Sequence, residues 1–196
     1  MSPRSIEFPS EGIEDGAVKL RLLRDDDLSA LVSALQGPEF GRWTRVPQPY
    51  GEGEARAWFT EQAEVRSAGT GLHLVVADVG DDSLLGSVGL TEIDWDELRA
   101  NIGYWVARKS RRRGVATRSV RLLARWAFEA LPLERLGILV DRHNAASAGV
   151  AERSGFKREG VLRSYTIIKD TRRDMVSYSL LPEELPAQTT PPGAVR

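Results

Sequence analysis

Hydrophobic and polar residues follow two different periods along this chain, and the positions where the period changes delimit the expected elements. Strict alternation, which is typical of a half-buried strand, is clear in the segment VKLRLL at 18–23. Apolar residues spaced three and four apart, which indicate an amphipathic helix, are clearest at 115–130. Strands are predicted at 18–23, 72–78, 84–93, 99–106, 135–140, 157–168 and 173–180, and helices at 25–35, 52–67, 115–130 and 146–153.

Along the chain the predicted order is one strand, two helices, three strands, a helix, a strand, a helix and two strands. Such an order predicts an α/β fold with one mixed sheet and antiparallel edges. One domain is expected at 17–181, between a polar N-terminal arm at 1–16 and a disordered, proline-rich tail at 182–196. Residues 43–50, which include two prolines, are expected to form a loop.

The composition narrows the class of protein. With 196 residues, 41% hydrophobic and 28% charged, the chain suits one soluble domain with a sizeable core. The absence of cysteine excludes disulfide scaffolds, thiolate zinc sites and cysteine nucleophiles, and the two isolated histidines predict no metal site. No apolar run approaches the roughly 18 residues of a membrane span, and the N-terminus lacks a signal-peptide core, which favours a cytoplasmic protein without membrane partners.

The most informative segment is IGYWVARKSRRRGVAT at 102–117, where a predicted strand, a basic loop and the start of the long helix follow each other. The free N–H groups and the positive dipole end of a helix start form a ready anion site. Gly114 has no Cβ that would keep a phosphate away from the backbone. Residues 108–125 also hold eight Lys and Arg and no acid, in a chain whose net charge is −1. A polyphosphate ligand explains these features together.

Two common phosphate motifs, GxxxxGK[ST] and GxGxxG, are missing from the chain, and the loop instead reads Arg111-x-x-Gly114-x-Ala116. This motif resembles the pyrophosphate loop [QR]-x-x-G-x-[GA] of the GNAT superfamily of acyl-CoA N-acyltransferases. Further support comes from IGYWV at 102–106, NAAS at 144–147, VAERSGF at 150–156 and EGVLR at 159–163. Over about 17–181 the set is similar to the RimJ/RimL-type subgroup, the ribosomal-protein N-terminal acetyltransferases.

The resemblance implies a GNAT fold, in which a mixed and mostly antiparallel sheet is flanked by helices and splays between its fourth and fifth strands. Acetyl-CoA would lie in the gap as the cosubstrate. The resemblance assigns its binding to Trp105, Val106, Arg111, Arg112, Arg113, Gly114, Val115, Ala116, Thr117, Asn144 and Ser147. The backbone N–H of Tyr104 would face the thioester oxygen, and Ser147 would protonate or hydrogen-bond the departing thiolate.

The reaction so implied is direct attack of a primary amine on acetyl-CoA in a ternary complex, without a covalent enzyme intermediate, in keeping with the missing cysteine. The chain departs from the family pattern at the general base. Where many members carry Glu, four residues before the position of Tyr104, this chain has Ala100. An acidic cluster at 92–97 closes the third predicted strand, and Glu92 within it is the candidate base.

The missing base favours one class of acceptor. A lysine amine with a pKa near 10.4 is neutral in roughly one molecule in two thousand at pH 7, whereas an α-amine with a pKa near 8 is neutral in about a tenth. The sequence therefore favours a protein N-terminus or a small-molecule α-amine as the acceptor. Ribosomal-protein N-termini, free amino acids, polyamines and amine antibiotics all fit the fold.

Other interpretations stay open at this point. The change at Ala100 also suits a non-catalytic acyl-CoA-binding sensor. The arginine-rich loop also suits contact with nucleic acid, although it lacks the aromatic residues that would stack on bases. Asn144 and Ser147 could serve only to cap the helix that follows them, and the acidic cluster could be a solvated loop. The sequence also leaves open whether the protein forms a homodimer.

Overall fold

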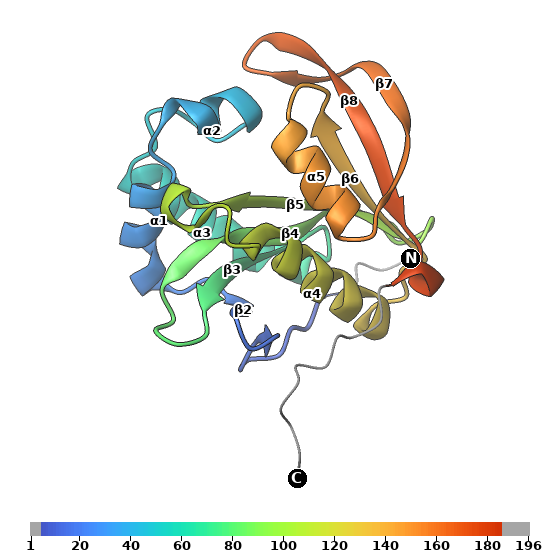
Figure 1. The fold of residues 1–196 in the computed structure, drawn as a ribbon. Helices are drawn as coiled ribbons and strands as arrows, with labels where there is room; N and C mark the ends of the chain where they lie inside the picture. Colours follow the sequence, from blue (N-terminus) through green and yellow to red (C-terminus); the bar gives the residue numbers. More distant parts are fainter. Residues whose placement is uncertain (1–4, 186–196) are drawn as a thin grey trace.

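A computed structural model describes residues 5–185, whose frame is an eight-stranded sheet with the order β1-β2-β3-β4-β5-β6-β8-β7 (Figure 1). The strands are β1 (Ile13–Glu14), β2 (Val18–Leu22), β3 (Leu72–Asp78), β4 (Leu84–Asp94), β5 (Arg99–Val106), β6 (Arg135–Asp141), β7 (Lys157–Ile168) and β8 (Thr171–Leu180). Neighbouring strands are antiparallel, except that β5 and β6 run parallel.

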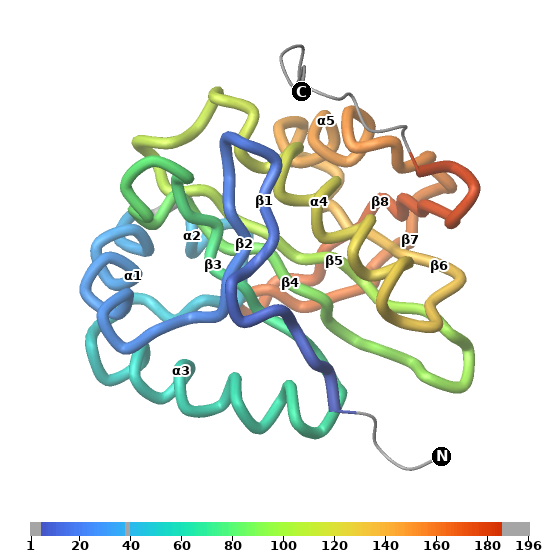
Figure 2. Tube along the Cα trace, turned by 90° about the horizontal axis from the view of Figure 1, so that it is seen from below, coloured from blue at the N-terminus to red at the C-terminus, as the bar shows by residue number. Residues whose placement is uncertain are grey.

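The helices that cover this sheet are α1 (Leu28–Ala34), α2 (Pro38–Trp43), α3 (Glu52–Ser67), α4 (Val115–Ala130) and α5 (Ala145–Arg153). Short 3-10 turns occur at Asp25–Asp27, Arg108–Ser110 and Pro182–Glu184. In Figure 2, α3 lies on one side of the sheet, and α4 and α5 lie on the other. The mixed, mostly antiparallel sheet with flanking helices that the sequence predicts is therefore confirmed.

Strand β3 is buried on both faces, and its alternating residues divide between two hydrophobic clusters. Leu72, Leu74 and Val76 join the larger cluster with α4, whereas Val75 and Ala77 join a smaller cluster with α1 and α3. This division follows from the period of two in an extended strand that lies between two helical layers. The smaller cluster holds α1 and α3 against the sheet.

The N-terminal segment, predicted as a polar arm, contributes two side chains to the hydrophobic core. Ile6 and Phe8 are buried, and the Phe8 ring meets Trp126 of α4 edge to face, with 4.9 Å between the ring centroids. Polar neighbours hid these two buried side chains in the sequence pattern. Of the predicted tail, Pro182–Glu184 forms a 3-10 turn, and 186–196 lies outside the described residues.

One helix, α2, was not predicted from the sequence pattern. Gly37 has a φ of 120°, a conformation that favours glycine, and Pro38 then stands at the start of the helix. These two residues therefore start a new helix soon after α1 ends at Ala34. With six residues, α2 is too short to show a helical period in the sequence.

Strands β5 and β6 diverge after a short stretch of pairing. Residues 99–101 pair with residues 135–137, and within the described part of the chain residues 102–106 have no partner in β6. Gly137 and Asn101 form the last pair, and a β-carbon at Gly137 would collide with Oδ1 of Asn101. The predicted splay between these two strands is confirmed, and it opens a gap in the middle of the sheet.

Candidate active site

Two cavities meet in the gap between β5 and β6. The α4 cavity, of about 600 Å³, is lined by the starts of α4 and α5 together with β5 and α2. The α3 cavity, of about 850 Å³, is lined by α1, α3 and the strands β3 to β6. The residues that line both are Trp43, Thr44, Tyr104, Trp105, Asn144 and Ser147. Groups bound in the two cavities can therefore meet beside these six residues.

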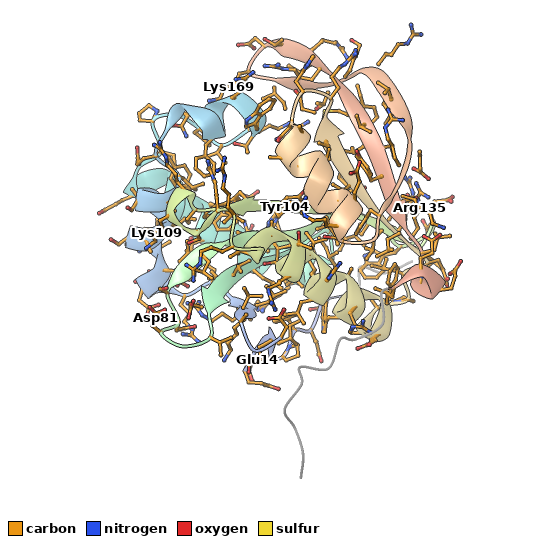
Figure 3. The ribbon with its side chains drawn as sticks, viewed as in Figure 1. Glu14, Asp81, Tyr104, Lys109, Arg135 and Lys169 are labelled. Atoms are coloured by element: carbon orange, nitrogen blue, oxygen red, sulfur yellow. The ribbon has the colours of Figure 1, made fainter. Side chains whose placement is uncertain are left out.

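Two segments that are far apart in the sequence make contact at Arg45, a residue of the α3 cavity lining. Arg45, in the loop after α2, donates from Nη2 to Oγ1 of Thr166 in β7 over 2.7 Å. Figure 3 labels Lys169 at the tip of the β7–β8 hairpin, next to α2, and a β-carbon added to Gly41 would lie 2.6 Å from its Nζ. The loop after α2 and the β7–β8 hairpin therefore lie against each other.

The start of α4 carries the features of an anion site. Gly114, at the N-cap, has a φ of 77°, and Arg112 has a φ of 61°. The first helical hydrogen bond runs from the N–H of Arg118 to the carbonyl of Gly114 over 3.0 Å, so the N–H groups of 115–117 precede the helical ladder. A β-carbon at Gly114 would meet nothing within 4 Å. Free amides and open space at one place suit the diphosphate that the sequence predicts.

The arginines of the loop differ in what they contact. Arg111 donates from Nε to the carbonyl of Val106 over 3.1 Å, and its guanidinium lies 5.7 Å from the centre of the Phe40 ring. Arg112 lines the α4 cavity and is exposed, whereas Arg113 is exposed but is not among the lining residues. The structure therefore places every predicted cofactor-binding residue except Arg113 at this cavity.

The side chain of Tyr104 crosses the gap to α5, a contact that the sequence did not reveal. Its hydroxyl lies 2.8 Å from Oγ of Ser147 and 3.1 Å from the carbonyl oxygen of the same residue. Figure 3 labels Tyr104 where β5 passes beside α5. Burial is the main cause that raises the pKa of Tyr104 to about 12, while its hydrogen bond with Ser147 acts in the opposite direction. The phenol therefore keeps its proton at neutral pH.

Asn144, not Ser147, is the residue that caps α5. Oδ1 of Asn144 accepts a hydrogen bond of 3.1 Å from the N–H of Ser147. The cap alone therefore does not account for the Ser147 hydroxyl, which points to Tyr104. Trp105 lines both cavities, and its ring meets that of Phe40 edge to face, with 5.7 Å between centroids.

The α3 cavity is rich in rings and carboxylates. Its aromatic lining is Trp43, Tyr50, Trp58, His73, Tyr104 and Trp105, and its charged lining is Arg45, Glu54, Glu61 and Asp141. Burial lowers the pKa of His73, whose ring lies 5.7 Å from that of Trp58, so this imidazole is neutral at pH 7. Three carboxylates against one guanidinium make this cavity favourable for a cation.

Glu92, the candidate base, lines a different cavity from the Tyr104–Ser147 pair. The chain at Glu92 has a φ of 51°, and its carboxylate accepts a hydrogen bond from Nδ2 of Asn101. It lines a separate cavity of about 760 Å³ beside β7, which adjoins the α3 cavity only at Ile138 and Leu139. The pairing of β4 with β5 shifts register between Thr91 and Asp94, and the sequence pattern could not show this irregularity.

The other acidic residues of the cluster at 92–97 are linked by hydrogen bonds within their own turn. The Asp94 carboxylate accepts the N–H groups of Asp96 and Glu97 and pairs with Arg99 at 3.0 Å. Hydrogen bonding, first that from the N–H of Glu97, holds the pKa of Asp94 below its usual value. A carboxylate stabilised as the anion in this way is a poor proton acceptor.

Residues 5–185 contain neither a metal-binding cluster nor a helix that could span a membrane. Within 5–185, His, Cys, Asp and Glu do not gather in any group of three or more that could hold a metal ion. In the same range, each helix is too short or too polar to cross a membrane.

Sequence comparisons agree with this geometry. The family model for the acetyltransferase (GNAT) domain matches residues 18–157. The Bacillus subtilis protein named "Putative ribosomal N-acetyltransferase YdaF" is 30% identical over 175 residues, which cover 85% of this chain and 92% of that protein.

Solved structures share the fold at lower identity. The microcin C7 self-immunity acetyltransferase MccE, in complex with acetyl-CoA and AMP, gives a TM-score of 0.82 at 20% identity and covers 89% of this chain and 98% of its own. RimJ of Mycobacterium smegmatis, in complex with CoA-disulfide, gives 0.79 at 24% identity over 90% of this chain and 86% of that one. Both therefore share the overall fold of this chain.

Proposed function

This chain belongs to the GNAT acetyltransferase family, and we propose that it transfers an acetyl group from acetyl-CoA to an α-amine by direct attack in a ternary complex. Family membership makes it an acyltransferase that acts on an amine. The observation that carries the finer proposal is the hydroxyl pair of Tyr104 and Ser147, 2.8 Å apart where the two cavities meet.

Acetyl-CoA supplies an acetyl group already activated as a thioester. The N–H groups of 115–117, with the positive φ of Arg112 and Gly114, suit its diphosphate. Trp105 and Val106 would hold the pantetheine arm along the edge of β5 that β6 leaves unpaired. Arg113 contributes positive charge from outside the cavity lining.

Tyr104 and Ser147 act on the two ends of the bond that breaks. The N–H of Tyr104 would donate to the oxygen on which negative charge develops, and one such donor is worth about 3 kcal/mol of barrier. Because its pKa of about 12 keeps the Tyr104 phenol protonated, this hydroxyl can donate to Oγ of Ser147. As the amine bonds to the acetyl carbon and the C–S bond breaks, Ser147 gives its proton to the departing sulfur. The proton that the amine nitrogen loses passes to water, from which the hydroxyl pair regains its own.

The proposed acceptor occupies the α3 cavity with its amine toward Ser147. Ala100 supplies no base, and Glu92 lies in a separate cavity, so an amine that is often neutral at pH 7 has an advantage. An α-amine is neutral about two hundred times more often than a lysine side chain at that pH. The proposal therefore favours a protein N-terminus or a small α-amine over a lysine side chain.

The test is thiol release from acetyl-CoA with L-alaninamide, Nα-acetyl-lysinamide and spermidine, with the acetylated products identified by mass spectrometry. We expect alaninamide to give the highest kcat/KM at pH 7. A clear preference for the lysine derivative overturns the α-amine acceptor. CoA binding without turnover of any amine supports the sensor, the alternative motivated by Ala100.

A further inference from the structure

One buried carboxylate in the lining of the α3 cavity has a hydrogen bond at only one of its two oxygens. Asp141, the last residue of β6, lines this cavity and is 5% exposed. Its Oδ1 accepts the N–H of His143 over 2.8 Å. Its Oδ2 is buried and has no hydrogen-bond partner among the described residues, and Nη1 of Arg173 lies 3.8 Å away. That distance exceeds the length of a hydrogen bond.

A buried anion with a free acceptor atom is costly, and proteins usually satisfy such atoms. Nε of Arg173 is buried and without a partner as well, so the two side chains face each other without a direct hydrogen bond. The position of Asp141 at a cavity wall points to a ligand that completes it. A group with several N–H donors and a positive charge fits this oxygen.

We propose that Asp141 binds the α-amine of the acceptor in the ammonium form in which most of it arrives at pH 7, before the amine loses a proton to water and attacks. This inference rests on the proposed function, since it names the residue that holds the acceptor in the α3 cavity. In the sequence Asp141 stands three residues before Asn144, which caps the helix of Ser147, and its carbonyl accepts the N–H of Asn144 over 2.8 Å. Asp141, Tyr104 and Ser147 all line the α3 cavity, so an amine held at Asp141 is in the same cavity as the hydroxyl pair.

The rest of the lining favours the same charge. The other carboxylates are Glu54 and Glu61 of α3, while Arg45 donates to the Thr166 hydroxyl. His73 is neutral because burial lowers its pKa. On the β8 side, Arg173 is the cation nearest to Asp141 and opposes binding of a second one. Removing that arginine should therefore strengthen the hold on an amine.

The first experiment measures binding to the full-length protein loaded with CoA, by calorimetry. L-Alaninamide is the cationic probe, and L-lactamide, which has a hydroxyl in place of the amine, is its uncharged counterpart. The wild type should bind alaninamide at least tenfold more tightly than lactamide. In Asp141→Asn this preference should fall below threefold, while the remaining oxygen can still accept the N–H of His143 and keep the turn.

Asp174→Asn is the matched control. Asp174 lies on β8 and does not line the α3 cavity. Its carboxylate pairs at 2.9 Å with Arg142, the residue after Asp141, and accepts the N–H of Ser164. This variant should keep the wild-type preference within twofold. Arg173→Met should change the affinity in the opposite direction to Asp141→Asn, because it removes a positive charge near Asp141. Alaninamide should bind more tightly, by about twofold or more, and the affinity for lactamide should not change.

Equal affinity of the wild type for the two probes, including no binding of either, overturns the inference. The same holds if Asp141→Asn keeps the preference, or if Arg173→Met weakens alaninamide binding. These outcomes are separate from failure of the proposed function, which is the absence of any acetylated amine in the turnover assay. CoA affinity should be the same in the wild type and in all three variants.

Discussion

The two cavities that meet at Ser147 are built in different ways. The α4 cavity draws its anion site from one continuous stretch, 111–117, and relies on backbone N–H groups. The α3 cavity is assembled from side chains on α1, α3, four strands, β8 and the loop after α2. Backbone donors are the same whatever the residue, so the first cavity needs only a glycine and a helix start. The second depends on which side chains the fold brings together.

This difference explains what could be predicted from the sequence. Gly114 and the helix behind it form a local pattern, so the start of α4 could be predicted, and it lines the α4 cavity where the diphosphate is proposed to bind. Tyr104 and Ser147 were both identified, but their hydroxyl contact joins residues 43 positions apart and has no sequence signal. Asp141 was passed over because its burial and its free oxygen exist only in the folded chain.

The elements of the fold that could be predicted are likewise those with a clear local sequence pattern. The bounds of α3, α4, β3, β5 and β7 match the predicted ranges, because each element is long enough for its period to be clear. The short α2 was missed, and the buried Ile6 and Phe8 were taken for part of a polar arm. Glu92 stands at a register shift in β4 and lines a separate cavity, and neither feature follows a sequence period.

The largest effect is expected where the backbone-built site is broken. Gly114→Glu places a carboxylate next to the amides of 115–117 and strains a residue with a φ of 77°. CoA affinity, measured by calorimetry, should fall by about 100-fold or more, because the change combines repulsion with loss of the loop conformation. Gly53→Glu is the control, since Gly53 lies in α3 with open space around its Cβ position and no positive φ. Unchanged CoA affinity in Gly114→Glu would remove the phosphate assignment.

The next effect belongs to the junction of the two cavities. Ser147→Ala removes the hydroxyl proposed to protonate the thiolate, so kcat should fall by about 100-fold while the Kd for CoA stays within twofold. Ser154→Ala is the control on the same helix, because the Ser154 hydroxyl is buried and has no hydrogen-bond partner among the described residues. Equal turnover of the two variants would contradict the role of Ser147.

A smaller effect is expected one step further from the sulfur. Tyr104→Phe keeps the backbone N–H and the ring but removes the hydroxyl that contacts Ser147. The kcat should fall by roughly tenfold, less than in Ser147→Ala, because one hydrogen bond in the chain of hydroxyls is lost. A kcat equal to that of the wild type, measured with alaninamide, would show that the phenol does not act through Ser147.

The smallest effect concerns the side-chain-built cavity and its pH dependence. Burial lowers the pKa of His73 below 6.5, so on acidification the unfolded chain takes up this proton before the folded protein does. Stability from the neutral ring is therefore present above pH 6.5 and lost as the pH falls below it. Between pH 7.5 and 5, the Tm of the wild type should fall about 2 °C more than that of His73→Gln. If the Tm of the two proteins falls by the same amount between these pH values, the lowered pKa of His73 is contradicted.

The central claim is that the amides at the start of α4 bind the diphosphate of a CoA thioester and thereby place its acetyl group between the two cavities. A crystal structure of the protein with acetyl-CoA tests this most directly. We predict the diphosphate on the N–H groups of 115–117 and the thioester beside Tyr104 and Ser147. A diphosphate bound at any other place on the molecule would contradict the account.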